Sequence, residues 1–318
     1  MNDLFASSSL LEEVKLNARK NEGEGKRPGK NVFVVVLISL AIFLMSQVAT
    51  SILVGSYMAF KVFSTQDITQ GFSIDLSFSN DSFDSNMILI MLYSEIVMIL
   101  LIIFYVKIFE KRGPSTLGFI KKGAIPSYLS GIAGAVLFIG AALLIGVASD
   151  AIELSYKGCD IIQLILFFFA WTIQGLAEEV MCRGFLMTSI VRRNSVTCAV
   201  MVNSLVFSLL HAFNPSGMSV LPLINLFLFG IFASLMFIRS GNIWLCAAFH
   251  SVWNLLQGNL LGIPVSGIKI PSILSSVFSE RLWFVNGGDF GLEGGIGVSV
   301  VLIAGCLILL FAGREKTN

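Results

Sequence analysis

Long runs of apolar residues alternate along the chain with short polar connections. A membrane-spanning helix needs about 20 mostly apolar residues, because each residue adds about 1.5 Å across a hydrocarbon layer about 30 Å thick. Runs of this length predict about eight spanning helices among the 318 residues. The predicted ranges are 32–60, 86–108, 128–149, 161–190, 196–213, 220–239, 243–262 and 295–313. The pattern therefore predicts an all-α, polytopic helical bundle embedded in a membrane.

The composition agrees with this class of protein. Hydrophobic residues make up 55% of the chain and charged residues 13%, and the mean hydropathy is +0.85. A typical soluble domain has about 25% charged residues. The formal net charge of +1 provides no extended field for a polyanion. We therefore expect contact with the lipid bilayer and no nucleic-acid partner.

Lysine and arginine mark one side of the predicted membrane domain. They flank the spans in alternate connections, and segments of this kind stay in the cytoplasm. The residues concerned are Lys26, Arg27, Lys30, Lys107, Lys111, Arg112, Lys121, Lys122, Arg192, Arg193, Arg239, Arg314 and Lys316. Both termini are therefore expected in the cytoplasm. The expected organisation is a polar N-terminal tail at 1–30, a membrane-embedded domain at 31–313 and a C-terminal tail at 314–318.

The connections on the opposite side are acidic or nearly uncharged. Connection 64–85 carries four aspartates and no Lys or Arg, and connection 150–160 has Lys157 as its one basic residue. The last of these connections, 263–294, is long and rich in glycine. It is interpreted either as a turn-rich surface segment or as a lid or partner surface over the outer mouth of the bundle.

The fourth predicted span contains three ionisable residues in the stretch AEEVMCRGFL, residues 177–186. Each charge at the centre of a bilayer costs about 2.5–3.5 kcal/mol on insertion scales, so these side chains should face the interior of the bundle. Glu179 and Arg183 are four residues apart, which places them on neighbouring turns where they can pair. Glu178 points about 100° away from Glu179. We expect this second carboxylate to be available for another role.

Both histidines of the chain also lie in predicted spans. His211 and Glu178 are nearly equidistant from the turn between the fourth and fifth spans, so an antiparallel hairpin places them at the same height. His250 and Asn254 are one helical turn apart in the seventh span and share a face. They reach the same height if the hairpin of spans four and five projects further into the cytoplasm or tilts. We therefore expect one shared polar site.

The chemistry that suits these residues is the addition of water to an amide. Glu178 would act as a general base on a water that it holds with His211, and His250 with Asn254 would stabilise the developing oxyanion. A zinc ion held by Glu178, His211 and His250 is the alternative. We favour the version that requires no cofactor, and the zinc motif HExxH is absent.

Three motifs resemble those of the CPBP family of intramembrane proteases, which are related to CAAX prenyl protease 2 and to bacterial abortive-infection membrane proteins. EEVMCR (178–183) resembles the family's EExxxR motif, FSLLH (207–211) its FxxxH motif and HSVWN (250–254) its HxxxN motif. Their order and their placement on the fourth, fifth and seventh spans also agree. The resemblance covers roughly residues 110–262. Members of the family are described both as metalloproteases and as glutamate proteases.

The resemblance implies a peptidase, either glutamate- or metal-dependent, with six functional residues. The implied roles are water activation for Glu178 and His211, support of the substrate and of the site geometry for Glu179 and Arg183, and oxyanion stabilisation for His250 and Asn254.

The expected function is hydrolysis of a peptide bond in a membrane-associated peptide or protein, near the cytoplasmic half of the bilayer. The expected location is integral and multi-pass, in a bacterial plasma membrane. One alternative is a non-catalytic immunity or scaffold protein that binds a peptide or partner in the same cavity. Another is a transporter that uses Glu and His as a proton relay. The candidate substrates are a prenylated peptide, a leader peptide and a membrane regulator.

Overall fold

The computed structural model describes residues 8–22, 29–65, 84–214 and 219–311 of the chain. Several predicted segments lie partly or wholly outside these ranges. They include Lys26 and Arg27 of the N-terminal tail, most of the acidic connection 64–85, the last two residues of the predicted span 295–313, and the C-terminal tail 314–318.

Helices occupy all eight predicted ranges within the described part of the chain. They are α2 (Val32–Thr65), α3 (Ser85–Ser94) with α4 (Ile96–Phe109), α5 (Ala124–Ala148), α6 (Ile161–Glu179) with η3 (Val180–Met187) and α7 (Thr188–Val191), α8 (Val196–His211), α9 (Val220–Ser240), α10 (Trp244–Leu255) with η4 (Leu256–Leu260), and α12 (Ile296–Phe311). The segments η3 and η4 are π-helical turns.

Five of these helical segments are long and apolar enough to cross a membrane by themselves. They are Val32–Ser64, Ser85–Phe109, Ala124–Ala148, Ile161–Val191 and Val220–Ser240. The helices α8 and α12 are apolar but shorter. The presence of several spanning helices is thus confirmed, and the number of eight crossings stays a prediction.

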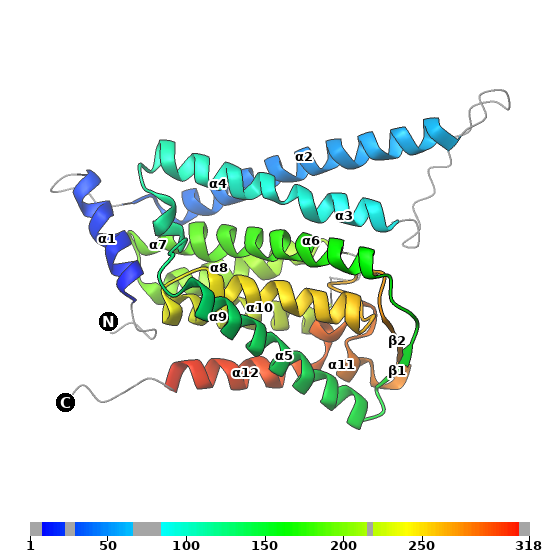
Figure 1. Cartoon of the computed structure of the whole chain (residues 1–318). Coiled ribbons are helices and arrows are strands. Elements are labelled where there is room, and N and C mark those ends of the chain that lie inside the picture. The colour runs from blue at the N-terminus through cyan, green and yellow to red at the C-terminus, as the bar shows by residue number, and fades with distance from the viewer. Residues whose placement is uncertain (1–7, 23–28, 66–83, 215–218, 312–318) are drawn as a thin grey trace.

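The helix α10 runs through the centre of the bundle (Figure 1). It packs against α5 on one side and α6 on the other, while α2, α3 and α4 lie beyond α6. All residues of α10 from Cys246 to Asn254 are buried. A helix surrounded by protein can carry polar side chains without exposing them to lipid, and His250 and Asn254 of α10 are buried in this way.

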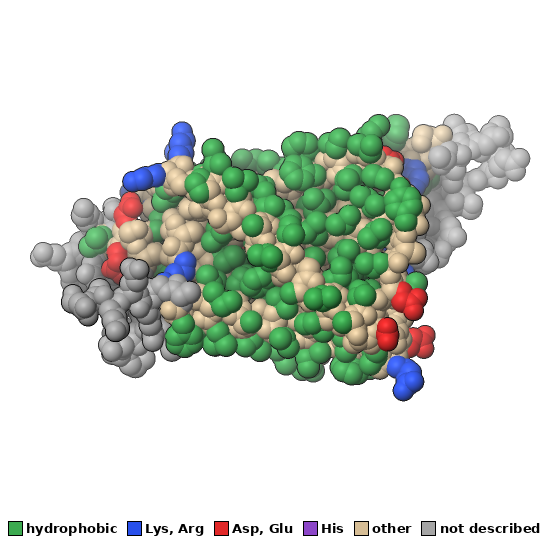
Figure 2. All heavy atoms as spheres, turned by 60° about the horizontal axis from the view of Figure 1, so that its bottom comes forward, with side chains coloured by type: hydrophobic (Ala, Val, Ile, Leu, Met, Phe, Trp, Pro, Cys, Tyr) green, Lys and Arg blue, Asp and Glu red, His purple; other side chains and the backbone are tan. Residues whose placement is uncertain are grey.

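The outer surface matches a bilayer environment. Figure 2 shows a broad hydrophobic band across the bundle, with Lys, Arg, Asp and Glu side chains gathered toward its two ends. Large apolar side chains such as Phe33, Leu44 and Ile52 on α2 are more than half exposed. Exposure of this extent over whole helices is typical of a lipid-facing surface and not of a soluble domain.

A small sheet departs from the expected all-α fold. Strand β1 (Ile152–Tyr156) pairs antiparallel with β2 (Leu274–Phe278), with Ile152 opposite Phe278 and Tyr156 opposite Leu274. The sheet joins two connections that were both predicted on the outer side. Sequence patterns missed it because five-residue strands between long apolar helices give little periodic signal.

The N-terminal tail also contains structure that its polar composition does not predict. The helix α1 (Ser9–Glu22) buries Leu10, Leu11 and Val14 and contacts α7 and the 3₁₀ turn η2 (Pro114–Leu117). The end of the bundle that carries α1 is the end at which α4, α7 and α12 terminate (Figure 1).

A buried polar cluster ties this end together. Glu110 accepts a hydrogen bond of 2.6 Å from Arg112 and lies 3.3 Å from Arg192. Arg112 also donates to the hydroxyls of Thr188 and Ser189 on α7. The connection after α4 is therefore fixed to the end of α7 by charge-assisted hydrogen bonds.

The contact between α5 and α10 leads to a first prediction. A Cβ at Gly131 would lie 2.8 Å from Ala248 Cβ and would clash with the Leu245 carbonyl oxygen. Gly131→Ala should therefore force the two helices apart and destabilise the protein by about 1–3 kcal/mol. Thermal unfolding in detergent micelles measures this effect. The matched control is Gly140→Ala on the same helix, where a Cβ meets nothing within 4 Å. Equal shifts for the two variants would contradict the packing argument.

Candidate active site

The ion pair between Glu179 and Arg183 forms the buried base of the site. Arg183 Nη1 donates to Glu179 Oε1 at 2.9 Å, as the four-residue spacing predicts. Arg183 Nη2 donates to the Gly230 carbonyl at 3.1 Å, and the guanidinium lies over the ring of Phe207 at 5.0 Å. Both charged side chains are fully buried. The pairing therefore allows two charges to exist inside an apolar bundle.

The pair sits where the helix changes from α to π geometry. Glu178 and Glu179 end α6, and Arg183 lies in η3, whose eight residues are all buried. Short π segments inside α-helices are rare and occur frequently at functional sites.

His250 connects this base to the second glutamate. Its Nδ1 lies 2.9 Å from Glu179 Oε1, and its Nε2 lies 3.7 Å from Glu178 Oε2. His250 thus bridges the two neighbouring carboxylates of α6. The fold therefore brings His250 to the same height as Glu178, as a shared polar site requires.

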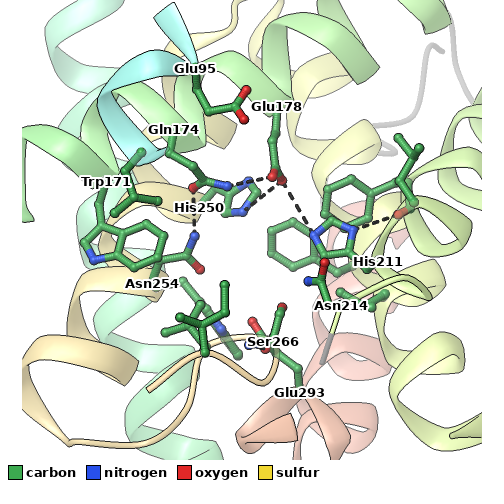
Figure 3. A pocket seen from close by; sticks show the side chains of 18 of the residues that line it. Glu95, Trp171, Gln174, Glu178, His211, Asn214, His250, Asn254, Ser266 and Glu293 are labelled. Carbon is green, nitrogen blue, oxygen red and sulfur yellow. Dashed lines mark hydrogen bonds and ion pairs between the residues drawn. The ribbon is translucent and has the colours of Figure 1, made fainter. Parts of the chain in front are cut away.

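His211 approaches the same carboxylate oxygen from α8. Its Nε2 lies 3.8 Å from Glu178 Oε2, and its Nδ1 lies 2.8 Å from the Phe207 carbonyl oxygen. Figure 3 shows Glu178 between the two imidazoles, with His211 and His250 on either side of it. The predicted meeting of Glu178 with His211 is therefore present in the structure.

The hydrogen bonds of the two histidines at Nδ1 determine the state of their other ring nitrogen, Nε2, which faces Glu178. A carbonyl oxygen and a carboxylate only accept, so Nδ1 of His211 and Nδ1 of His250 both carry the hydrogen. When the rings are neutral, each Nε2 then presents a lone pair. Among the described residues Glu178 Oε2 has no hydrogen-bond partner. Three acceptors therefore converge on one point, and they require a donor or a cation between them.

Gln174 is a site residue that the sequence analysis missed. Its Nε2 donates to Glu178 Oε1 at 2.6 Å, and its Oε1 accepts from Asn254 Nδ2 at 3.0 Å. The available signal was its position four residues before Glu178, which places both on one face of α6. Asn254, predicted as an oxyanion stabiliser, reaches the site with its amide nitrogen already bonded to Gln174.

A cavity of about 210 Å³ opens in front of these residues. Phe207, Phe229 and Trp253 give it an aromatic wall, and Glu95 lies on the side of Glu178 (Figure 3). Glu95 Oε1 accepts from Gln47 Nε2 at 3.1 Å. Glu95 was also missed, although a carboxylate inside an apolar span is itself a signal of function.

The connection 263–294 contributes Ser266, Ile268 and Glu293 to the cavity. Ser266 donates to Glu293 Oε2 through its backbone nitrogen at 2.9 Å and its hydroxyl at 3.1 Å. Burial raises the pKa of Glu293 above its ordinary value, while the hydrogen bond from the Ser266 backbone opposes the shift. Part of this connection therefore covers the site.

The covering residues of the site come from connection 263–294, whose strand β2 lies at the end of the bundle opposite α1 (Figure 1). This connection was predicted on the outer side of the membrane. The length of the fourth helix beyond Glu178 agrees with this placement. Residues 179–191 separate the site from the basic turn, a rise of about 20 Å at 1.5 Å per residue.

The alternative zinc site would use Glu178, His211 and His250, whose facing atoms lie 3.7 and 3.8 Å apart. Glu178, His211 and His250 are suitable ligand types, and acceptors orient both imidazoles as in many metal sites. However, the described residues contain no group of three or more His, Cys, Asp and Glu side chains that could hold a metal ion. No chemical step below is derived through a metal.

The fold and the site define a helical membrane protein with a carboxylate, two imidazoles and two amides around a buried cavity. In sequence, residues 160–256 match the family model described as Rce1-like, the type II CAAX prenyl endopeptidase Rce1-like family. The match confirms the resemblance to the CPBP and CAAX proteases for these residues, and it contains all six predicted site residues. No curated protein matches the chain significantly. The match and the apolar helices together support an integral membrane peptidase.

The buried pair leads to a second prediction. Arg183→Ala should lower stability by about 3–5 kcal/mol, because it leaves the Glu179 charge buried without its cationic partner. Thermal unfolding of the purified protein in micelles measures the loss. The double variant Glu179→Gln with Arg183→Met removes both charges and keeps an oxygen for His250 Nδ1, so it should recover much of the stability. An Arg183→Ala variant that unfolds at the wild-type temperature would refute the pairing argument.

Proposed function

We propose that this protein is an intramembrane endopeptidase that hydrolyses a peptide bond with a water activated by Glu178 and His211. The observation that carries the proposal is the convergence of Glu178 Oε2 with Nε2 of His211 and Nε2 of His250. With His250 protonated at Nε2, a water completes this arrangement, because it donates hydrogens to Glu178 Oε2 and His211 Nε2 and keeps a lone pair for attack. The family match over residues 160–256 supports peptidase chemistry at the same residues.

The proton balance of the proposed reaction uses Glu178 twice. Glu178 Oε2 takes a proton from the water as its oxygen attacks the carbonyl carbon of the scissile bond. The resulting tetrahedral intermediate carries a negative oxygen. Glu178 then delivers the proton to the amide nitrogen, the carbon–nitrogen bond breaks, and a carboxyl and an amine product result. His211 orients the water through Nε2, because its Nδ1 is fixed to Phe207.

His250 is the proposed stabiliser of the tetrahedral oxyanion. Its Nδ1 is held by Glu179, and a second proton, taken up from solvent water before the reaction, makes it an imidazolium at Nε2. The charges of this imidazolium and of Arg183 together balance the two carboxylates of Glu178 and Glu179. Nε2–H can then donate to the oxyanion, which is the arrangement that lowers the barrier in acyl transfer. Glu179 and Arg183 act behind it by keeping the ring in place.

We infer that the membrane is a bacterial plasma membrane with the α1 end of the bundle in the cytoplasm. The basic residues at the ends of α4, α7 and α9 support this orientation. In that orientation the cavity lies toward the outer side of the bilayer. A peptide held in the outer half of the membrane is then the substrate whose scissile bond reaches Glu178 most directly.

A third prediction tests the general base. Glu178→Gln keeps the shape of the side chain but removes its basicity, so kcat should fall by at least about 100-fold. The assay uses the protein in lipid vesicles with quenched-fluorescent reporters: a farnesylated CAAX peptide, prompted by the description of the matched family, and unprenylated apolar leader peptides. Glu153→Gln, an exposed change on β1, is the matched control and should retain full activity.

The same variants separate the proposed enzyme from a binding protein or a transporter. Peptides that accumulate uncut in cells carrying Glu178→Gln identify the substrate. A cellular phenotype that survives Glu178→Gln would favour a non-catalytic scaffold. Flux that depends on a pH gradient, with no peptide cleaved by the wild type, would favour a transporter.

A fourth prediction concerns the metal. Reporter cleavage should persist after incubation with 1,10-phenanthroline and EDTA followed by removal of the chelators. Metal analysis of the treated protein provides the control for complete extraction. Loss of activity that zinc restores would overturn the metal-free mechanism and leave the peptidase assignment standing.

A further inference from the structure

We propose that Gln174 is a positioning residue, and that Asn254 and Gln174 together form an amide relay that holds the catalytic carboxylate of Glu178. The inference rests on the proposed function of Glu178 as general base. Gln174 lies outside the three sequence motifs, yet it is the residue that directly contacts Glu178 Oε1. The relay runs from α10 to α6 through two hydrogen bonds of 3.0 and 2.6 Å.

The direction of both amides follows from the carboxylate. An ionised Glu178 only accepts hydrogen bonds, so Gln174 must turn its NH₂ group toward it. The carbonyl of Gln174 then faces Asn254, which must offer its own NH₂ group. A flip of either amide would set two acceptors or two donors against each other. The charge of Glu178 thus fixes the orientation of both amides, and they in turn fix Glu178.

Burial makes this arrangement specific. Gln174 and Asn254 are both buried, so their polar groups have no alternative partner in bulk water and a broken bond carries a desolvation cost. The backbones of α6 and α10 approach closely beside them. A Cβ at Gly175 would lie 2.9 Å from the Ser251 nitrogen. This close approach is what allows a Gln side chain to reach an Asn side chain between the helices.

The relay gives the two oxygens of Glu178 different tasks. Oε1 is occupied by Gln174, while Oε2 faces both histidines at 3.7 and 3.8 Å. Without Gln174 the carboxylate could rotate about its terminal torsion, and Oε2 would lose its alignment with the water. Figure 3 shows Gln174 on the side of Glu178 that faces Asn254, away from His211.

This arrangement also changes the role expected for Asn254. One of its two N–H hydrogens goes to Gln174, and in Figure 3 its oxygen is turned toward the cavity. An oxyanion needs a donor, so a carbonyl oxygen in that position does not stabilise it. We assign Asn254 to positioning through Gln174.

The first test compares kinetics on whichever reporter the wild type cleaves. Gln174→Leu should lower kcat by about 10–100-fold, by analogy with residues that orient metal ligands through hydrogen bonds, with KM changed less than about threefold. Gln163→Leu, the same change on the same helix but outside the cavity, should match the wild type. A larger effect on KM than on kcat would assign Gln174 to substrate binding and overturn the proposal.

A double-variant comparison tests whether Asn254 acts through Gln174. If it does, Gln174→Leu with Asn254→Leu should be no slower than Gln174→Leu alone. If Asn254 contacted the oxyanion directly, the two losses would multiply. Multiplied losses would therefore contradict the proposed relay.

An isosteric variant covers the case in which Gln174→Leu does not fold. Gln174→Glu replaces the NH₂ group by an oxygen that can donate to Glu178 only when it is protonated. The activity of this variant relative to the wild type should be highest at low pH and fall as the pH rises and the new carboxyl ionises. A constant ratio across the pH range would contradict a hydrogen bond from position 174 to Glu178.

A spectroscopic readout separates failure of the relay from failure of the proposed function. Infrared difference spectra against Glu178→Gln isolate the carboxylate band of Glu178, and Gln174→Leu should shift that band while Gln163→Leu leaves it in place. A shifted band in a protein that cleaves no reporter would contradict the peptidase proposal and support the relay. An unshifted band in an active enzyme would contradict the relay alone.

Discussion

The cost of placing ionised side chains inside an apolar bundle is the constraint on which the site depends. For Glu179 this cost is offset by contacts with Arg183 and His250. For Arg183 it is offset further by the Gly230 carbonyl and two aromatic rings. These contacts join η3, α9 and α10 at one point. Because a charge left alone there is expensive, the same contacts that compensate Glu179 also fix the relative positions of the helices that carry the proposed catalytic groups.

Two consecutive glutamates acquire different chemistry from this constraint. Glu179 is enclosed and committed to structure, whereas Glu178 is partly exposed and faces the cavity with one oxygen held and the other directed at the histidines. The difference arises from the helix itself, since neighbouring residues point about 100° apart. One faces the packed centre of the bundle and the other faces the cavity, so the local sequence EE supplies both a structural carboxylate and the proposed base.

The positions of the helices and the meeting of Glu178, Glu179, Arg183, His211 and His250 could be predicted from the sequence. Helix length follows from hydrophobic runs, and the turn after Val191 fixes the register of α6 against α8. Gln174 could not be assigned in this way, because a lone amide in a span has no unique partner until the contact with Asn254 is known. Likewise, Glu293 and the sheet depend on long-range contacts between connections, which hydrophobic periodicity does not encode. The side of the bundle on which the cavity opens depends on how far η3 and α7 extend beyond Glu178.

The pairing of β1 with β2 has a consequence for traffic through the cavity. Asn286 reinforces the pairing by donating to the carbonyls of Ala151 and Ser279, and Ser266 is bonded to Glu293. Connection 263–294, which covers the site, is therefore held by several hydrogen bonds, and moving it away from the cavity would break them together. For the proposed peptidase, lateral entry between helices would cost less, because the apolar flanks of a long peptide would stay in the lipid. Selection would then depend on how a substrate lies in the bilayer, before its side chains reach the site.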